Sequence, residues 1–369
     1  MFKKYSMRYY NYILFSLVVA IMLIGILVIN SVNSVYTVKQ SIGFGISIVF
    51  MIIISFIDYH FILKFAYPLY IFSTVLLALV LLAGTSVNNA RRWFTLAGIR
   101  FQPSELAKIL MIIFMAFFLS KLIEEEKVNS IRGIFGFLFF WAIPILLIYK
   151  EPDLSTTLCL TLVLFTLLYI SGLSYKIIGI ALLILIPTFS IFIWYIQKPD
   201  QKLLYQHQVT RIMSFIYPSE YEDETMQQEN SVMAIGSGQL MGKGLRKKGD
   251  TNTSDTNLIS EQQTDFIFSA VGESFGFFGS VIIIGIILLI VLQCIRAGRH
   301  ARDDAGSLLA YGIGCLIGYQ SFINIGVATK LLPNTGIPLP FVSYGLTSLV
   351  SLSIGIGIVL NVSLQKKRY

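Results

Sequence analysis

The chain has 369 residues, of which 55% are hydrophobic and 13% are charged, and its mean hydropathy is +0.74. This composition exceeds what a water-soluble globule needs for its core, so it excludes soluble protein classes and indicates an integral membrane protein. The net charge of +8 is spread over short basic clusters between apolar runs, a pattern that indicates membrane topology and not nucleic-acid binding.

Apolar runs of about 20 residues, the length that crosses a bilayer as a helix, recur along the chain. The first run is too long for a cleaved signal peptide, so it is expected to remain as a span. Ten spans are expected in all, at about 11–30, 41–57, 61–84, 104–122, 134–149, 154–171, 177–196, 265–292, 306–328 and 339–362. The chain is therefore predicted to be an all-α polytopic membrane protein with a single integral membrane domain over residues 1–369.

An even number of spans places both termini on the same side of the membrane. Thirteen of the 28 lysines and arginines fall on that side, against six in the short loops of the opposite side, so the positive-inside rule predicts cytoplasmic termini. Three segments then face outward, at 86–104, 197–264 and 329–340. The large extracytoplasmic loop 197–264, between the seventh and eighth spans, is too long to be structureless and is expected to pack over the outer face of the bundle.

Near Asp265 a polar loop runs into an apolar helix that still carries acids. At about 100° per residue, Asp265, Ser269, Gly272, Glu273 and Gly276 share one face of that helix. An ionised carboxylate costs roughly 2.5 to 3.5 kcal/mol at the centre of a hydrocarbon layer, so such residues usually face a bundle interior or a watery cavity and mark a site. Asp265 is therefore predicted to stand at the mouth of a functional site.

Other polar residues could join this site. Glu105 and Lys108 share a face just inside the fourth span and are expected to pair with each other or with a third group. Arg92 and Trp93 fit an anchor at headgroup level and a substrate contact equally well. The proline-rich stretch 324–345 cannot be a continuous helix, and irregular backbone at membrane depth is tolerated where it is buried or lines a wet cavity.

Nucleotide and metal sites are disfavoured. The glycines before Lys243 lack the spacing of a phosphate-binding loop and no strand precedes them, so a short re-entrant or interfacial helix is expected instead. Lys243 could attract an anionic headgroup or belong to a solvated charge run. The three histidines are scattered, and the three cysteines lie inside apolar runs without the spacing of metal ligands.

Several spaced motifs point to a known family. They are Arg92-Trp93, Phe101-Gln-Pro-Ser-Glu-Leu-Ala-Lys108, Pro152-Asp-Leu154, Ala234-Ile-Gly-Ser-Gly238, Gly242-Lys-Gly244, Thr264-Asp-Phe-Ile-Phe268, Gly272-Glu273, Leu332-Pro333 and Pro338-Leu-Pro-Phe-Val-Ser-Tyr-Gly345. In this order the chain resembles, nearly end to end, the SEDS family (shape, elongation, division and sporulation) of RodA and FtsW type. Its short tails and the spelling around Asp265 favour the rod-elongation branch.

The resemblance implies a ten-helix bundle in the bacterial plasma membrane that polymerises lipid II into peptidoglycan glycan strands, with its active site facing outside. It places the family's essential aspartate on Asp265, its lysine and glutamate on Lys108 and Glu105, and its tryptophan on Trp93. It also implies a class B penicillin-binding protein as partner, together with other elongation or division machinery. The residues expected to support Asp265 or bind substrate are Lys108, Glu105, Trp93, Arg92, Arg211, Glu261, Glu273, Lys243 and Ser343.

In the resulting hypothesis Asp265 is the general base of an inverting glycosyl transfer. Lys108 would orient Asp265. Alternatively Lys108, together with Arg91, Arg92, Arg211 or a divalent cation (Mg²⁺ or Mn²⁺, for which Asp265 is a candidate ligand), would offset the charge of the departing pyrophosphate. The rival interpretation is a flippase or transporter of lipid-linked precursors, since charged and broken helices also suit translocation. A structural scaffold is a third interpretation, but it leaves Asp265 and Glu273 unexplained.

Overall fold

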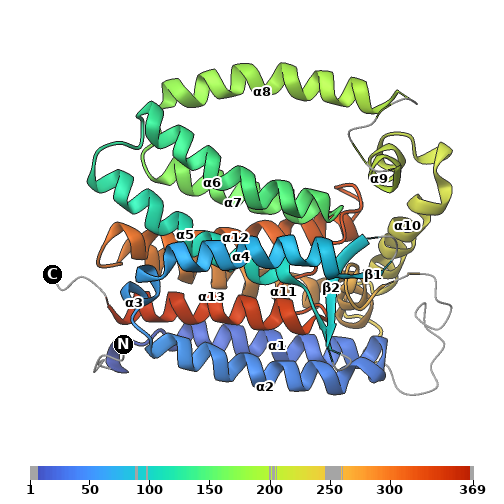
Figure 1. Ribbon diagram of the computed structural model, residues 1–369. Coiled ribbons are helices and arrows are strands. Elements are labelled where there is room, and N and C mark those ends of the chain that lie inside the picture. Colours follow the sequence, from blue (N-terminus) through green and yellow to red (C-terminus); the bar gives the residue numbers. More distant parts are fainter. Residues whose placement is uncertain are drawn as a thin grey trace.

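The computed structural model describes residues 7–87, 90–96, 99–198, 201, 204, 206–245, 259 and 261–365. Over these residues the chain is almost entirely helical, and its long helices run side by side as a bundle (Figure 1). The long helices are α1 (Tyr12–Val32), α2 (Ser34–Phe56), α4 (Ala66–Ala83), α5 (Pro103–Glu124), α6 (Ile131–Lys150), α7 (Leu154–Ile170), α8 (Tyr175–Ile196), α11 (Ile267–Arg299), α12 (Asp304–Ala328) and α13 (Leu346–Leu364).

These helices correspond one to one with the ten expected spans. Within the described part of the chain, nine of them are long and apolar enough to cross a membrane, and α7 is a shorter apolar helix of 17 residues. The prediction of an all-α polytopic membrane protein is confirmed. Both ends of the chain lie at the same end of the bundle (Figure 1).

The centre of the bundle is formed by α5, α12 and α13. In these helices 67%, 67% and 78% of the most apolar window is buried inside the protein, whereas in α8 none of it is. Small residues permit this close packing: Gly312 of α12 lies against Ile112 of α5, and Gly355 of α13 lies against Ile109 and Ile313. Helix α8 is apolar on all sides and stands apart from α6 and α7 (Figure 1).

Polar side chains start many of the helices. Their oxygens accept a backbone N–H of the first turn, which satisfies a donor that the helix itself leaves free. The capping residues are Asn11 for α1, Asn33 for α2, Asp58 for the short α3 (Tyr59–Lys64), Ser130 for α6, Asp153 for α7, Ser174 for α8 and Asp303 for α12. A short 3-10 helix, η1 (Met7–Tyr9), precedes α1.

The expected outer segment 86–104 contains a small sheet. Strands β1 (Thr85–Val87), β2 (Ala90–Leu96) and β3 (Ile99–Phe101) pair antiparallel in that order. Thr85 faces Trp93 and Phe94 faces Phe101 in the register. Aromatic and β-branched residues favour such pairing, and the sheet leads directly into Pro103, which begins α5.

Several span boundaries differ from the prediction by two to seven residues, among them the starts of α2 and α4 and the end of α11, and two of the differences lie near Asp265. Helix α11 begins at Ile267, so Asp265 lies in the turn before it and not on its face. The last helix begins at Leu346 and not near residue 339, because Pro338, Pro340 and their neighbours keep the preceding stretch irregular.

A break inside α11 was also not predicted. At Gly276 the backbone takes φ 65° and ψ −159°, which interrupts the helix. The segment after α10 (Glu222–Ser237) fills this break: Lys243 N donates to Glu273 O (2.9 Å) and Phe277 N donates to Gln239 O (2.8 Å). A side chain at Gly242 would overlap the backbone at Ser274, which explains the glycines that the sequence shows before Lys243.

The described part of the expected loop 197–264 lies against the end of the bundle opposite the termini. It forms α9 (Gln206–Ile216), the 3-10 helix η2 (Pro218–Glu220) and α10 (Figure 1). Ser231 of α10 donates to Ala328 O (2.7 Å), and Gln228 donates to Val327 O (3.0 Å) and Leu332 O (2.8 Å). Residues 246–258 of this loop lie outside the described residues.

Candidate active site

Asp265 lies in a turn that other segments hold in place. Asp265 N donates to Glu261 O (3.1 Å), closing the turn before α11. From α12, Asn324 Nδ2 donates to Asp265 O (2.8 Å) and to Ile337 O (2.7 Å). One buried amide therefore fixes the backbone of Asp265 against the irregular stretch that follows α12.

Ser343 makes a second connection between these segments. Its hydroxyl donates to Thr264 O (2.6 Å) and accepts from Leu339 N (2.8 Å). Tyr344 N donates to Gln263 O (2.9 Å) in the same turn. Ser343 was predicted as a supporting residue, and it contacts the residue that precedes Asp265.

The Asp265 carboxylate faces Gly336 and Arg211. A side chain at Gly336, where φ is +75°, would place its first carbon 3.2 Å from Asp265 Oδ2 and 3.7 Å from Arg211 Nη1. Arg211 Nη1 in turn donates to Thr335 O (3.4 Å). Gly336 therefore leaves room for the Asp265 carboxylate, and any other residue would also be strained by the positive φ at this position.

Burial raises the pKa of Asp265 to about 6 from its ordinary value of 3.8. Arg211 works against this rise by favouring the charged form, while Glu261 and Asp153 add to it. A carboxylate with this pKa is mostly ionised at neutral pH, and its pKa lies only about one unit below that pH. Both properties suit a general base.

A second polar cluster lies beside this one, at the turn between α6 and α7. Arg92 Nε of β2 donates to Glu151 O (2.7 Å), Arg92 Nη2 donates to Pro152 O, and Arg92 Nη1 lies 4.0 Å from Asp153 Oδ2. Ser155 donates to Thr335 O, the same carbonyl that Arg211 contacts. The two clusters therefore share one carbonyl of the stretch after α12.

Glu151 is the residue that the sequence analysis missed. It is completely buried, and neither carboxyl oxygen has a hydrogen-bond partner among the described residues. Burial, and then the nearby Asp153, raise the pKa of Glu151 to about 9, against the opposing effect of Arg92. In the sequence Glu151 is seen only as an acid beside Pro152, next to the motif Pro152-Asp-Leu154, and nothing local indicates that it is buried.

The predicted pair of Glu105 and Lys108 forms inside α5. Lys108 Nζ lies 2.8 Å from Glu105 Oε1, and the two residues are 1% and 4% exposed. Each charge offsets the other at a depth where an isolated charge would be costly. The charged groups that act on Asp265 are instead Arg211, Glu261 and Asp153.

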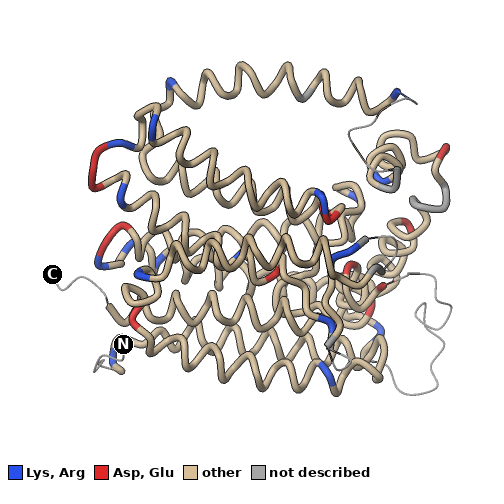
Figure 2. Tube along the Cα trace, in the orientation of Figure 1, with Lys and Arg blue, Asp and Glu red and all other residues tan. Residues whose placement is uncertain are grey.

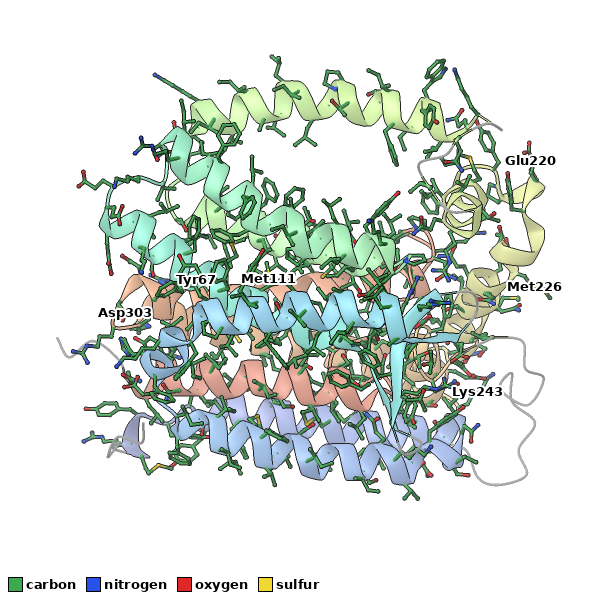
Figure 3. All side chains as sticks on the ribbon, viewed as in Figure 1. Tyr67, Met111, Glu220, Met226, Lys243 and Asp303 are labelled. Carbon is green, nitrogen blue, oxygen red and sulfur yellow. The ribbon has the colours of Figure 1, made fainter. Side chains whose placement is uncertain are left out.

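The remaining predicted residues are distributed around the same end of the bundle. Lys243 Nζ pairs with Glu273 Oε1 (3.0 Å) and ties the segment after α10 to α11; Figure 3 labels Lys243 at the end opposite Asp303. Trp93 is partly buried in β2, next to Arg92. Glu261 is exposed and accepts from Gln263 Nε2 (3.0 Å).

Ligation of a divalent cation by Asp265 stays a prediction. Among the described residues there is no group of three or more His, Cys, Asp or Glu side chains that could hold a metal ion. The guanidinium of Arg211 lies on the same side of Gly336 as the Asp265 carboxylate and favours its charged form.

Comparison with known proteins identifies relatives over almost the full chain. The family model of the FtsW, RodA and SpoVE cell cycle proteins matches residues 5–368. A probable peptidoglycan glycosyltransferase FtsW of Geobacter sp. (strain M18) is 32% identical, over 97% of this chain and 98% of that protein. The peptidoglycan glycosyltransferase MrdB of Escherichia coli (strain K12) is 33% identical, over 81% of this chain and 78% of that protein.

Solved structures agree with this result. A chain from the structure titled "Structural coordination of polymerization and crosslinking by a peptidoglycan synthase complex" superposes with a TM-score of 0.79 at 26% identity, covering 96% of this chain and 97% of that chain. The rod shape determining protein RodA of Thermus thermophilus superposes with a TM-score of 0.71 at 26% identity and covers 98% of both chains. The chain therefore belongs to the FtsW, RodA and SpoVE family of cell cycle proteins.

Proposed function

We propose that this chain polymerises lipid II into glycan strands, with Asp265 as the general base. Glycosyltransferase activity follows from the family, whose relatives from Geobacter and E. coli are named peptidoglycan glycosyltransferases. The observation that carries the assignment to Asp265 is its geometry. Its backbone is held by Asn324, while its carboxylate faces Gly336 and Arg211 and is not used to cap α11.

The proposed reaction is a single displacement. The hydroxyl of the acceptor sugar gives its proton to an Asp265 oxygen as its own oxygen forms a bond to the anomeric carbon of the donor. The bond between that carbon and the pyrophosphate oxygen breaks, and the lipid pyrophosphate leaves with the electron pair. Attack from the face opposite the leaving group inverts the anomeric centre, as expected for one base and one displacement.

Arg211 is assigned to the charge that develops on the departing pyrophosphate. A guanidinium offers a fork of donors that matches phosphate oxygens, and a donor held in place before reaction stabilises charge without reorganisation. Its position is set by the contact with Thr335 O, which Ser155 also reaches.

The distribution of charge supports a site on the outer side of the membrane. Charged residues gather at the two ends of the bundle, and few lie between them (Figure 2). The end of the bundle that carries the termini also carries arginines and lysines of the described part of the chain, such as Arg132, Lys176 and Arg296. The positive-inside rule assigns this end to the cytoplasm. We infer a multi-pass protein of the bacterial plasma membrane with Asp265 facing outward, and a class B penicillin-binding protein as its partner.

The test is polymerisation by the purified chain. Incubation with lipid II followed by gel analysis should show lengthened glycan for the parent and none above background for Asp265→Asn. Translocation of lipid II across vesicle membranes without glycan synthesis would favour the flippase interpretation instead. Full polymerisation by correctly folded Asp265→Asn would remove Asp265 from the mechanism while leaving the family activity intact.

A further inference from the structure

A cavity lies at the end of the bundle that carries the termini, far from Asp265. It has a volume of about 310 Å³ and lies between the start of α1, the last turns of α11 and the end of α13. Arg8 of η1 and Arg296 of α11 line it from two sides. Tyr9 and Tyr12, which are 45% and 54% exposed, stand at its edge.

The charge of this cavity is one-sided. No carboxylate is among the residues that line it, and neither guanidinium has an ion-pair partner within the described part of the chain. Arginine stays protonated at any physiological pH, so Arg8 and Arg296 present two uncompensated positive charges to one space. Such a site favours an anion.

The wall of the cavity also offers neutral polar groups. Ser363 is 1% exposed and lines the cavity, and its hydroxyl has no hydrogen-bond partner among the described residues. Asn11 donates to Gln293 Oε1 (3.2 Å), which ties the cap of α1 to α11 beneath the two arginines. A buried hydroxyl left unpaired in the protein costs free energy, and a ligand oxygen in the cavity could satisfy it.

The surroundings indicate a lipid and not a soluble anion. Ile13 lines the cavity and is 58% exposed, and Leu289 and Leu292 of α11 are 47% and 48% exposed. These leucines lie one helical turn before Gln293 and Arg296, so the apolar face of α11 continues directly from the cavity. Tyrosines at the edge match the aromatic belt of a membrane interface.

We propose that this cavity binds the phosphodiester headgroup of an anionic phospholipid, with the acyl chains along the exposed face of α11. Arg8 and Arg296 bind the phosphate oxygens, and Ser363 and Gln293 provide polar contacts at the wall. Basic pockets between transmembrane helices are a known form of lipid recognition. The site is separate from the glycosyl transfer site and goes beyond the proposed function.

Native mass spectrometry of the full, delipidated chain tests the proposal. The chain is titrated with phosphatidylglycerol and, separately, with phosphatidylcholine, and the dissociation constant of the first bound lipid is compared. We expect tighter binding of phosphatidylglycerol. Arg8→Gln/Arg296→Gln should weaken it roughly 30-fold, equivalent to about 1 kcal/mol per arginine at about 1.4 kcal/mol per tenfold change, and should leave phosphatidylcholine unchanged.

Three controls make the result decisive. Arg132→Gln/Lys176→Gln removes two exposed charges from the same end of the bundle but away from the cavity, and it should keep the preference. Arg8→Lys/Arg296→Lys keeps the charge and should retain most of the preference, even if the glutamine variant is poorly folded. Ser363→Ala should weaken phosphatidylglycerol by a smaller factor.

The proposal is overturned by any of three outcomes. The parent could bind both lipids equally, or the Arg132/Lys176 variant could lose the preference as fully as the Arg8/Arg296 variant, which would make it a diffuse charge effect. Inorganic phosphate could also displace phosphatidylglycerol from the parent, which would assign the cavity to a soluble anion. If phosphatidylglycerol resists inorganic phosphate, the lipid assignment is supported.

Discussion

Asp265 and Asp303 stand in similar positions at opposite ends of the bundle, each just before a long helix. Both carboxylate oxygens of Asp303 have protein partners. Oδ1 accepts from Gly306 N (2.7 Å) and from the Tyr59 hydroxyl (3.0 Å), and Oδ2 lies 2.6 Å from His60 Nε2. Asp265 does not cap α11, whose first residues have no side-chain cap. An aspartate therefore connects structural elements at one end of the bundle and is the proposed general base at the other.

The difference comes from the neighbours. At the end of the termini, Asp58 accepts from Gln365 Nε2 (2.8 Å) and lies 2.9 Å from His60 Nδ1, so His60 bridges two carboxylates from separate elements. At the opposite end, side chains hold the backbone around Asp265, while Arg211 and the Thr264 side chain are the groups that favour its charged form. The pKa of Asp265 is raised because the effect of burial outweighs those of Arg211 and the Thr264 side chain.

The largest effect in this comparison is expected from Asp265→Asn. The side chain keeps its shape but cannot take a proton, and a positioned general base contributes typically about 10²- to 10⁴-fold. Polymerisation of lipid II by the purified variant should fall by a factor in this range. The measurement is the initial rate of glycan formation.

Thermal unfolding of the same variant separates chemistry from folding. Burial raises the pKa of Asp265, which means that the charged form destabilises the fold relative to the neutral one. Asp265→Asn should therefore unfold at the parent temperature or above it. A variant that lost activity only because it unfolded at a lower temperature would not support a catalytic role.

Arg211→Gln should have the next largest effect. Removing a charge that stabilises the leaving pyrophosphate is expected to cost about 10²-fold in rate. Arg211 also lowers the pKa of Asp265, so its loss should move the acid limb of the pH profile upward. In the parent this limb should have its midpoint near pH 6, with the rate rising with pH because the base must be ionised.

Arg211→Lys serves as the matched variant for this experiment. A lysine keeps the charge but not the fork of donors, so the acid limb should stay near that of the parent while the rate falls. If Arg211→Gln left the acid limb where it is, Arg211 would not act on Asp265. The assignment of Arg211 to the site would then rest on the leaving group alone.

The sequence predicted the ten spans because apolar length is a local property of the chain. It also predicted the pair of Glu105 and Lys108, since residues three apart on a helix meet without help from the rest of the fold. The motif around Asp265 was visible, but the helix start was misplaced by two residues. Asn324 and Ser343, which hold that turn, come from elements far along the chain.

The features that were not predicted all depend on tertiary placement. The break at Gly276 is stable because residues 239–244 supply partners for the interrupted backbone, and nothing local to α11 indicates this. Glu151 is buried because β2 and the stretch after α12 close over an outer turn that the sequence alone shows as polar. The Glu151 carboxyl lacks a hydrogen-bond partner among the described residues because β2, the turn between α6 and α7 and the stretch after α12 meet around it.

Glu151→Gln tests whether the buried carboxyl of Glu151 makes the free energy of unfolding depend on pH. The pKa of Glu151 is raised to about 9 from 4.5, so the folded state holds its proton more tightly than the unfolded chain does. Its contribution is fully present at low pH and is lost as pH rises between these values, by at most about 1.4 kcal/mol per pH unit. The variant should have a flatter stability curve over this window, measured by thermal unfolding in detergent.

Glu125→Gln is the matched control for Glu151→Gln. Glu125 is exposed at the other end of the bundle, and its hydrogen bond with Lys127 lowers its pKa. Its substitution should leave the slope between about pH 5 and pH 9 as it is in the parent, because the group is already ionised there in both states. Equal flattening in both variants would show that Glu151 is not the source of the slope.

The smallest effect is expected from Asp303→Asn, the same substitution as Asp265→Asn at the opposite end. An asparagine oxygen still caps α12 and accepts from Tyr59, so only the charged contact with His60 is lost, at a cost of about 1 kcal/mol. Polymerisation at a temperature well below unfolding should equal that of the parent. If folded Asp303→Asn lost as much rate as Asp265→Asn, the contacts of Asp303 with Tyr59 and His60 would control the distant site. The distinction between Asp303 as a structural residue and Asp265 as the proposed general base would then be wrong.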